Sequence, residues 1–337
     1  MLKYFFVFFF LFSHCLLAQD IQFSQFYSVP VFQNPAFAGS AHSVRGIAHQ
    51  RIQWPRLQGK YITSFMSFDT YAAKYKSGFG IMVLKDFQGS NAISSTEVSL
   101  QYSYELNLSH SFTFRPGLQL GYVSRFVNYA EATFPHSFDD NGALSAPISI
   151  SSQKVIYPDI SSGGVLYSDK LWVGYAAHHL TRPNQSIYGE VARLPVAHAF
   201  TAGYNIEFGS KGDVYFAGST SKRVLIPTVH YKFQGKSDQL DWGLYYIHGQ
   251  ALIGAWYRGI PIKKYSRNFR NNESIILLIG WRYQSFGLSY SYDMTISKLS
   301  TARSGGAHEI NLTYIKGKYK KKKKPTKRIP CPSFYNY

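Results

Sequence analysis

From Val98 to Ser109 the chain alternates apolar and polar side chains without a break. The apolar set is Val98, Leu100, Tyr102, Tyr104, Leu106 and Leu108, and the intervening residues are Ser99, Gln101, Ser103, Glu105, Asn107 and Ser109. Successive side chains of a β-strand point to opposite faces, so this strand has one apolar and one polar face. Tilted strands cross a bilayer in roughly 9 to 11 residues. We therefore predict that Tyr102 faces lipid, whereas Ser103 faces away from it and tolerates arginine.

The same alternation recurs at 240–246, 286–293 and 309–314, and fifteen segments are strand candidates. Single-chain bacterial barrels have an even number of strands, so we join 213–220 to 224–233, because 220–223 lacks the Asn-Gly, Asp-Gly or Gly-Gly chemistry of a hairpin turn. An all-β, transmembrane antiparallel barrel of about 14 strands in an outer membrane is thus predicted. The predicted strands are 44–51, 60–69, 77–85, 96–106, 112–125, 159–167, 171–179, 196–208, 213–233, 239–247, 251–259, 274–284, 286–293 and 306–315.

The connections between these strands sort by length. The long segments 127–158, 180–195, 260–273 and 294–305 fall at one end of the barrel, and the short turns 107–111, 168–170, 209–212 and 248–250 fall at the other. Outer-membrane barrels have long outer loops and short periplasmic turns. We therefore expect the long segments outside the cell and both chain termini in the periplasm.

The first 18 residues resemble a secretory signal peptide, with Lys3, an apolar run from Tyr4 to Phe12, and cleavage after Ala18. Cys15 suggests a lipoprotein, but His14 before it is not the small residue that lipoprotein processing needs. No later run of 18 apolar residues is present, so strands and not helices would cross the membrane. The aromatic content of 17% suits the interfacial girdles of such a barrel.

Residues 19–42 are rich in aromatic side chains and contain Pro30 and Pro35. Because proline cannot donate to a sheet ladder, this segment is predicted to be extended or plug-like and not a wall strand. Its apolar side chains would be costly to expose, so we expect it to pack against or inside the barrel. The barrel itself is assigned to 43–316, and 317–337 to a basic periplasmic tail.

The net charge of +18 comes largely from that tail, which has nine lysines and arginines between Lys316 and Arg328. This composition is typical of a nucleic-acid-binding arm, but an exported barrel meets no nucleic acid. The only other cysteine besides Cys15 is Cys331, so the mature chain forms no internal disulfide.

Several motifs resemble the PorP/SprF family of type IX secretion system membrane proteins. They begin with the runs QFSQFY (22–27) and NPAFAG (34–39). Further matches are RIQWP (51–55), Asp86 with Gly89, HLT (179–181) with Pro183, WYR (256–258), SYD (291–293), GAHEI (306–310) and CPSF (331–334). The positions carried over, as structural or partner-binding residues, are Asn34, Pro35, Gly39, Arg51, Trp54, Asp86, Gly89, His179, Arg258, Tyr292, Asp293, His308, Glu309 and Cys331.

The resemblance implies a barrel that binds a cognate secreted surface protein, often an adhesin, through its C-terminal sorting domain and works with other type IX secretion components. A link to gliding motility is also implied. The alternative is a general outer-membrane channel or small-molecule transporter, which should conduct ions. Arg51, Trp54, Arg258 and Asp293 would either pair inside the lumen or form a partner surface.

No catalytic, metal or cofactor site is predicted, and we expect the protein not to be an enzyme. His308-Glu309 and His178-His179 are adjacent in strands, so each pair points to opposite faces and cannot chelate one ion. Asp139-Asp140 lacks the glutamate that a calcium loop needs at its end. The candidate cargo-contact loop, 127–158, carries the aromatics Tyr129, Phe134 and Phe138, which would either anchor a partner or fold over the barrel mouth.

Overall fold

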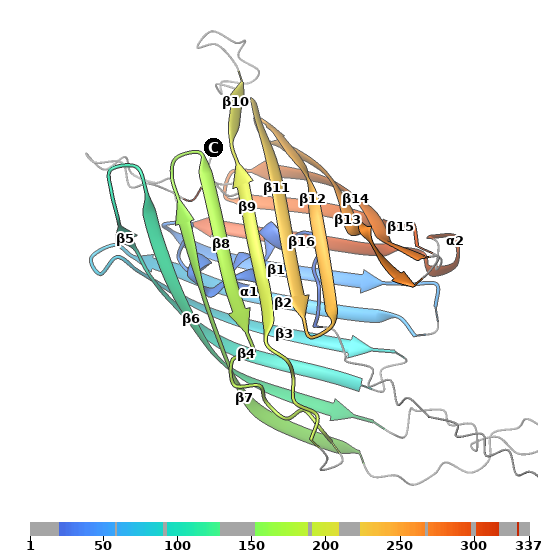
Figure 1. Cartoon of the computed structure of the whole chain (residues 1–337). Helices are drawn as coiled ribbons and strands as arrows, with labels where there is room; N and C mark the ends of the chain where they lie inside the picture. The colour runs from blue at the N-terminus through green and yellow to red at the C-terminus, as the bar shows by residue number, and fades with distance from the viewer. Residues whose placement is uncertain are drawn as a thin grey trace, which may run out of the picture.

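The computed structural model describes residues 20–57, 59–89, 93–128, 152–187, 191–208, 223–266, 269–297, 301–316 and 329. These form a twisted β-barrel (Figure 1). Its strands are β1 (Val44–Gln53), β2 (Tyr61–Ala72), β3 (Ser77–Gln88), β4 (Ile93–Tyr104), β5 (Leu106–Asn107), β6 (Thr113–Val127), β7 (Gln153–Tyr167), β8 (Leu171–His178), β9 (Ala197–Tyr204), β10 (Ile206–Phe208), β11 (Arg223–Gln234), β12 (Ser237–His248), β13 (Ala251–Ser266), β14 (Phe269–Tyr283), β15 (Phe286–Thr295) and β16 (Ala307–Lys316).

The sheet closes on itself with every pairing antiparallel. β16 pairs with β1, with Val44 opposite Lys316, and β9 pairs with β11. The sheet therefore has no open edge between these strands. The short strand β5 follows β4 along β6, and β10 follows β9 along β11, so the sixteen segments make fourteen wall strands. The predicted fourteen-strand barrel is confirmed.

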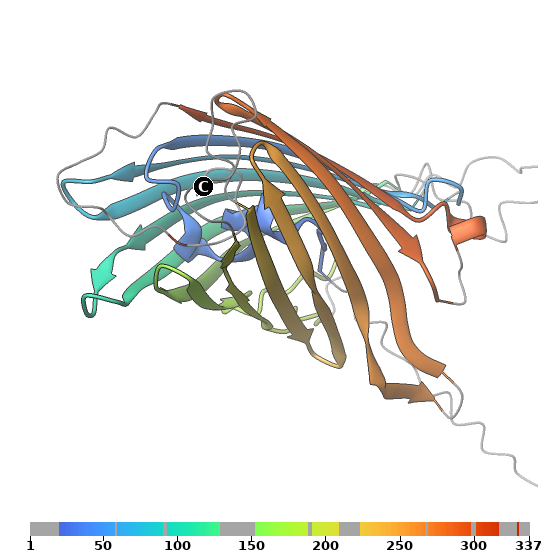
Figure 2. The same cartoon turned by 90° about the horizontal axis from the view of Figure 1, so that it is seen from above.

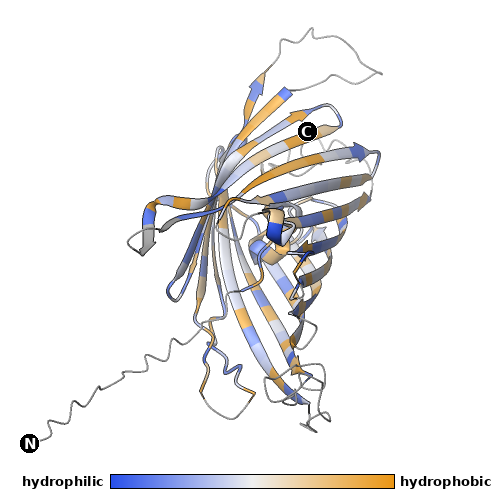
Figure 3. Ribbon diagram, turned by 90° about the vertical axis from the view of Figure 1, so that its right-hand side faces the viewer, coloured by the Kyte–Doolittle hydropathy of each residue, from blue (hydrophilic) through white to orange (hydrophobic). Residues whose placement is uncertain are grey.

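The wall has the two faces that the alternation predicts. Leu100 is 60% exposed on the outside, while its neighbours Ser99 and Gln101 are buried in the lumen. Apolar and polar residues therefore alternate as bands along single strands (Figure 3). The prediction that Ser103 tolerates arginine is wrong, because its hydroxyl donates to the carbonyl oxygen of Ala38 at 2.8 Å and its side chain is fully buried.

The strands extend further than predicted at the long-loop end. β13 and β14 continue across most of the expected loop 260–273, through register shifts after Arg258 and Ile260, so that prediction is wrong. These bulges interrupt the alternation that marks a strand in the sequence. β7 begins at Gln153, which shortens the loop after β6 to 128–152. Residues 213–222 of the merged strand, and Tyr129, Phe134 and Phe138, lie outside the described residues.

The N-terminal segment lies inside the barrel (Figure 2). It is not extended but folds into the helical turns η1 (Phe26–Ser28), α1 (Pro30–Gln33) and η2 (Pro35–Phe37), and a further short helix, α2 (Thr301–Ser304), lies between β15 and β16. Pro30 and Pro35 occupy first helical positions, where a missing N–H and a fixed φ are favourable. Within the described residues, no helix is long and apolar enough to span a membrane.

Aromatic packing holds this N-terminal segment in the lumen. Phe23 and Val31 pack in a buried cluster with Phe65 and Leu84, and Tyr27 packs edge to face on Tyr245 with ring centroids 4.5 Å apart. Ile329, from the C-terminal tail, is buried in the same cluster as Tyr27. Burying several such side chains, at about 1.5–3 kcal/mol each, is a strong driving force for filling the lumen.

Candidate functional site

The N-terminal segment runs the length of the lumen. Asp20 contacts His179, just beyond β8, and Gln234, at the end of β11, both at the long-loop end. Gly39 lies at the opposite end, where its amide donates to Asp69 at 2.7 Å, and the chain then enters β1 beside the end of β16. The first described residue therefore lies toward the end of the barrel opposite to Ser43 and Lys316. This arrangement disagrees with the expectation that both termini lie at the periplasmic end.

At the long-loop end, His179 bridges two carboxylates and fastens the start of the segment. Its Nδ1 lies 2.8 Å from Asp159 and its Nε2 lies 2.9 Å from Asp20. Burial alone would lower the pKa of His179, but the two carboxylates raise it well above its ordinary value of 6.5. Burial alone would raise the pKa of Asp20, but His179 lowers it below 3.8. The result is an imidazolium, His179, between the carboxylates of Asp20 and Asp159, and we call these three residues the latch.

In the middle of the lumen, charged wall residues pair with one another and hold the segment's backbone. Arg51 pairs with Glu309 and with Asp293, and Arg258 forms a two-point ion pair with Asp241 at 2.9 and 3.1 Å. The Glu309 carboxylate in turn accepts the backbone amides of Ser24 at 2.7 Å and Gln25 at 2.8 Å. These buried charges compensate one another, and removal of one partner would leave the others unpaired.

At the short-turn end, two arginines hold backbone carbonyls of the segment. Arg115 donates to the carbonyl oxygens of Ala36 and Ala38 and pairs with Glu105 at 3.1 Å. Arg45 donates to the carbonyl oxygen of Phe37 while pairing with Asp69. Irregular backbone inside a barrel needs such partners because its own amides and carbonyls are not paired in a sheet.

The motif residues chosen from the sequence divide into four groups. Asn34, Gly39, His179, Arg51, Arg258, Asp293 and Glu309 belong to the lumen contacts, with the Asn34 side chain donating to the carbonyl oxygen of Tyr175 at 3.0 Å. Pro35 starts η2, and Gly89 follows β3 with φ +58°. The Asp86 carboxylate accepts a hydrogen bond from the hydroxyl of Thr63 on the neighbouring strand β2. Cys331 lies outside the described residues.

The other three motif residues, Trp54, Tyr292 and His308, take no part in the lumen ion pairs, although Trp54 lines a cavity in the lumen. Trp54 caps the end of β1 with φ +56°, and its amide donates to the carbonyl oxygen of Gly306 at 2.8 Å. Tyr292 packs on His308 with ring centroids 4.8 Å apart, and His308 accepts or donates a 2.7 Å hydrogen bond with Tyr290. His308 and Glu309 therefore contribute to different faces of β16.

The sequence analysis missed Arg45, Asp69, Arg115 and Asp159. Each is a charged side chain at a buried, inward position of its strand. An inward charged residue could have been recognised in the sequence as part of the site, because a charge inside a membrane barrel needs a partner in the lumen. Within the described residues, no group of three or more His, Cys, Asp or Glu side chains could hold a metal ion.

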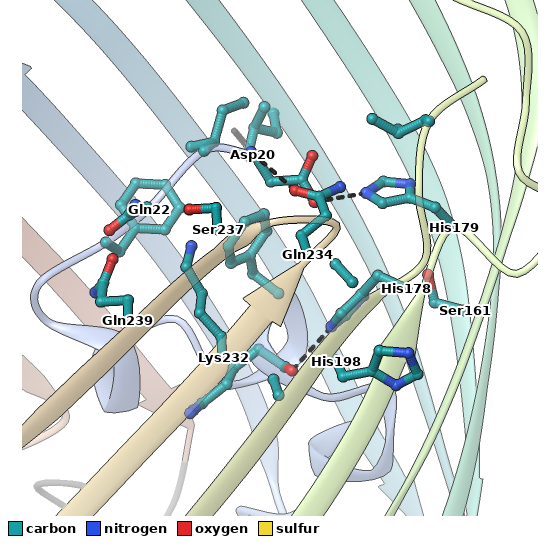
Figure 4. Close-up of a pocket in the computed structure, with 18 of the residues that line it drawn as sticks. Asp20, Gln22, Ser161, His178, His179, His198, Lys232, Gln234, Ser237 and Gln239 are labelled. Carbon is teal, nitrogen blue, oxygen red and sulfur yellow. Dashed lines mark hydrogen bonds and ion pairs between the residues drawn. The ribbon is translucent and has the colours of Figure 1, made fainter. Parts of the chain in front are cut away.

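Above the N-terminal segment, toward the long-loop end, the lumen contains a cavity of about 530 Å³. The segment contributes Asp20, Gln22 and Phe23 to its lining, and β11 and β12 contribute Lys232 and Gln239 (Figure 4). His178 also lines it and contacts the carbonyl oxygen of Gln33 at 3.2 Å. The cavity is within the size range of ligand sites, roughly 300–1,000 Å³.

The family model of the type IX secretion system membrane protein PorP/SprF matches residues 16–314. The chain belongs to the PorP/SprF family. It is thus a membrane protein of the type IX secretion system, and its closed fourteen-strand barrel places it in the outer membrane. The residues that match the PorP/SprF family model include the lumen-filling segment and nearly all of the barrel wall.

Solved barrels are similar in outline only. A Pseudomonas aeruginosa FadL homologue is 14% identical, with 85% of this chain and 93% of that chain covered and a TM-score of 0.38. The Ralstonia pickettii toluene transporter TbuX is 9% identical, with 86% and 94% covered and a TM-score of 0.49. The Acinetobacter baumannii protein Omp33 is 6% identical, with 82% and 98% covered and a TM-score of 0.44. No curated protein matches the chain.

Proposed function

We propose that this PorP/SprF barrel is a non-enzymatic anchor that binds a secreted surface protein through that partner's C-terminal sorting domain. The observation that carries the proposal is the lumen-filling segment. Its aromatic side chains and ion-paired contacts run from Asp20 at one end of the barrel to Gly39 at the other. A lumen occupied in this way suits binding at the mouth better than free passage of solutes.

The orientation follows from the connections. We place the long-loop end outside the cell and the ends of β1 and β16 toward the periplasm, since outer-membrane barrels have long outer loops. The chain would then leave β16 at the periplasmic end, where its basic residues 317–328 would meet other type IX secretion components, and through them gliding machinery, before Ile329 packs inside the lumen. Cleavage of the signal peptide after Ala18 would leave a mature chain whose start, near Asp20, lies within the lumen.

The contact surface would be the outer loops, because loops on a rigid wall carry function. The loop after β6 is the leading candidate, since Tyr129, Phe134 and Phe138 supply aromatic anchors of the kind that dominate binding interfaces. The second candidate function, a channel or small-molecule transporter, is favoured by the barrel fold alone.

Deletion of 128–146 tests the anchoring function. We expect a folded, heat-modifiable barrel in the outer membrane, with the cognate surface protein released into the medium or lost. The control removes His110 from the short turn at the opposite end of the barrel, which should leave surface display intact. Surface display that survives the loop deletion unchanged would exclude this loop as the docking site.

A further inference from the structure

The cavity above the N-terminal segment has one basic group without a partner. Lys232 of β11 is half-buried and lines the cavity, where its side chain points toward Gln22 and Gln239 (Figure 4). Among the described residues its ammonium forms no hydrogen bond and no ion pair. An ammonium in a partly enclosed site is costly unless an anion or strong acceptor neutralises it.

Most acidic groups of the cavity have other partners. Asp20 and Asp159 both bind His179, and Asp238 is paired with Lys263 at 2.7 Å. Glu97 accepts from Ser99 and from Gln119. Asp20 and, more weakly, Glu273 line the cavity close enough to act on the charge of Lys232, but neither forms an ion pair with it among the described residues. The ammonium is therefore available to a ligand.

The rest of the lining suits a polypeptide. Amide side chains that can donate to and accept from a peptide backbone come from both the N-terminal segment and the wall, for example Gln22, Gln33, Gln239 and Asn272. Between them lie apolar surfaces from Phe23, Phe26 and Leu194. Such a mixture of apolar walls and a few convergent polar groups is typical of specific ligand sites.

We propose that this cavity binds an acidic segment of a polypeptide that enters from the long-loop end, with a carboxylate on Lys232. The inference rests on the proposed function, because the segment would belong to the anchored partner. The N-terminal segment would then have a second role, as the floor of a binding site.

The probe is a pair of fluorescent hexapeptides with blocked termini, identical except for one glutamate in place of glutamine, added to the detergent-purified barrel. We expect the glutamate peptide to bind about tenfold to a hundredfold more tightly, as for a hydrogen bond to a charged group. Lys232→Gln should abolish this preference, and Lys232→Arg should retain it. Lys170→Gln, an exposed lysine in the short turn between β7 and β8 at the opposite end of the barrel, should also retain it. Heat-modifiable migration verifies folding of each variant.

Equal binding of the two peptides to the unaltered barrel would overturn the inference, as would a preference that survives Lys232→Gln. These results are separable from failure of the anchoring function. Loss of surface display on deletion of 128–146 without any glutamate preference would contradict the cavity site and leave the anchor intact. A glutamate preference that depends on Lys232 would support the cavity site whatever the loop deletion does.

Discussion

At the residue scale, three wall glycines allow the N-terminal segment to lie against the barrel. A Cβ at Gly78 would lie 2.0 Å from the carbonyl oxygen of Ala38, one at Gly117 would lie 2.2 Å from the amide nitrogen of Ala36, and one at Gly163 would lie 2.3 Å from the Asn34 side chain. No side chain can occupy such space, so glycine at these positions is required by the close approach of the N-terminal segment to the wall.

Gly117→Ala should therefore displace the segment around Ala36 and destabilise the protein by about 1–3 kcal/mol, as overpacking does. Unfolding in urea from detergent micelles measures the loss, and limited proteolysis shows whether the segment has moved. The matched control is Gly46→Ala in β1, where a Cβ meets nothing within 4 Å. Equal stability of the two variants would contradict the close approach.

The latch should respond to pH. The raised pKa of His179 makes its contribution complete below about pH 6.5 and lost as the pH rises through the folded value. The lowered pKa of Asp20 makes its contribution present above about pH 3.8 and lost as the pH falls through the folded value. The latch therefore contributes fully to holding the N-terminal segment between about pH 3.8 and about pH 6.5.

Amide hydrogen exchange of Ile21 and Gln22, corrected for intrinsic rates, should show protection that declines at alkaline pH. His179→Gln should lower protection in the acidic window and remove the alkaline decline, since glutamine has no charge to lose. An unchanged pH profile in that variant would mean that the latch does not control the segment.

At the element scale, the N-terminal segment should act as a plug. Deletion of 20–38 removes the aromatic clusters and leaves the wall strands in place. We expect planar-bilayer conductance to rise well above that of the intact barrel, because water would replace the segment. Arg115→Ala, which removes two carbonyl contacts to the segment and the ion pair with Glu105 but leaves the aromatic clusters in place, should have a smaller effect. A truncated barrel that conducts no better than the intact one would refute this role.

The strands were predictable because an alternating pattern is visible wherever one face meets lipid, as from Val98 to Leu108. The extension of β13 and β14 into 260–273 was not predictable, because bulges near Gly259 shift the alternation of inward and outward residues there. For the site, Arg51 and Asp293 were expected either to pair inside the lumen or to form a partner surface, and they pair inside it. The roles of Arg115 and Asp159 became apparent only when distant strands were placed side by side. The helical turns of 26–37 likewise form only against the wall.

At the scale of the whole molecule, the lipid-facing band should tolerate charge according to depth. Leu100 and Leu108 point outward and are 60% and 63% exposed, but Leu108 lies beyond β5, next to a turn. Leu100→Arg should cost about 2–4 kcal/mol, whereas a residue near the interface should cost about 0–1 kcal/mol. Folding yields and unfolding curves of Leu100→Arg and Leu108→Arg in lipid bilayers compare the two, and equal costs would contradict the predicted depth.

The position of the N-terminal segment has a consequence for the order of assembly. Ser24 binds Glu309, 285 residues away, and Asn34 reaches carbonyls of β7 and β8. A finished barrel offers no easy entrance for a folded segment that is held by buried polar contacts along its length. The wall must therefore close around the segment, with β1 and β16 joining after residues 20–39 are in position. The first part of the chain to be exported would then be enclosed before the last strand completes the ring.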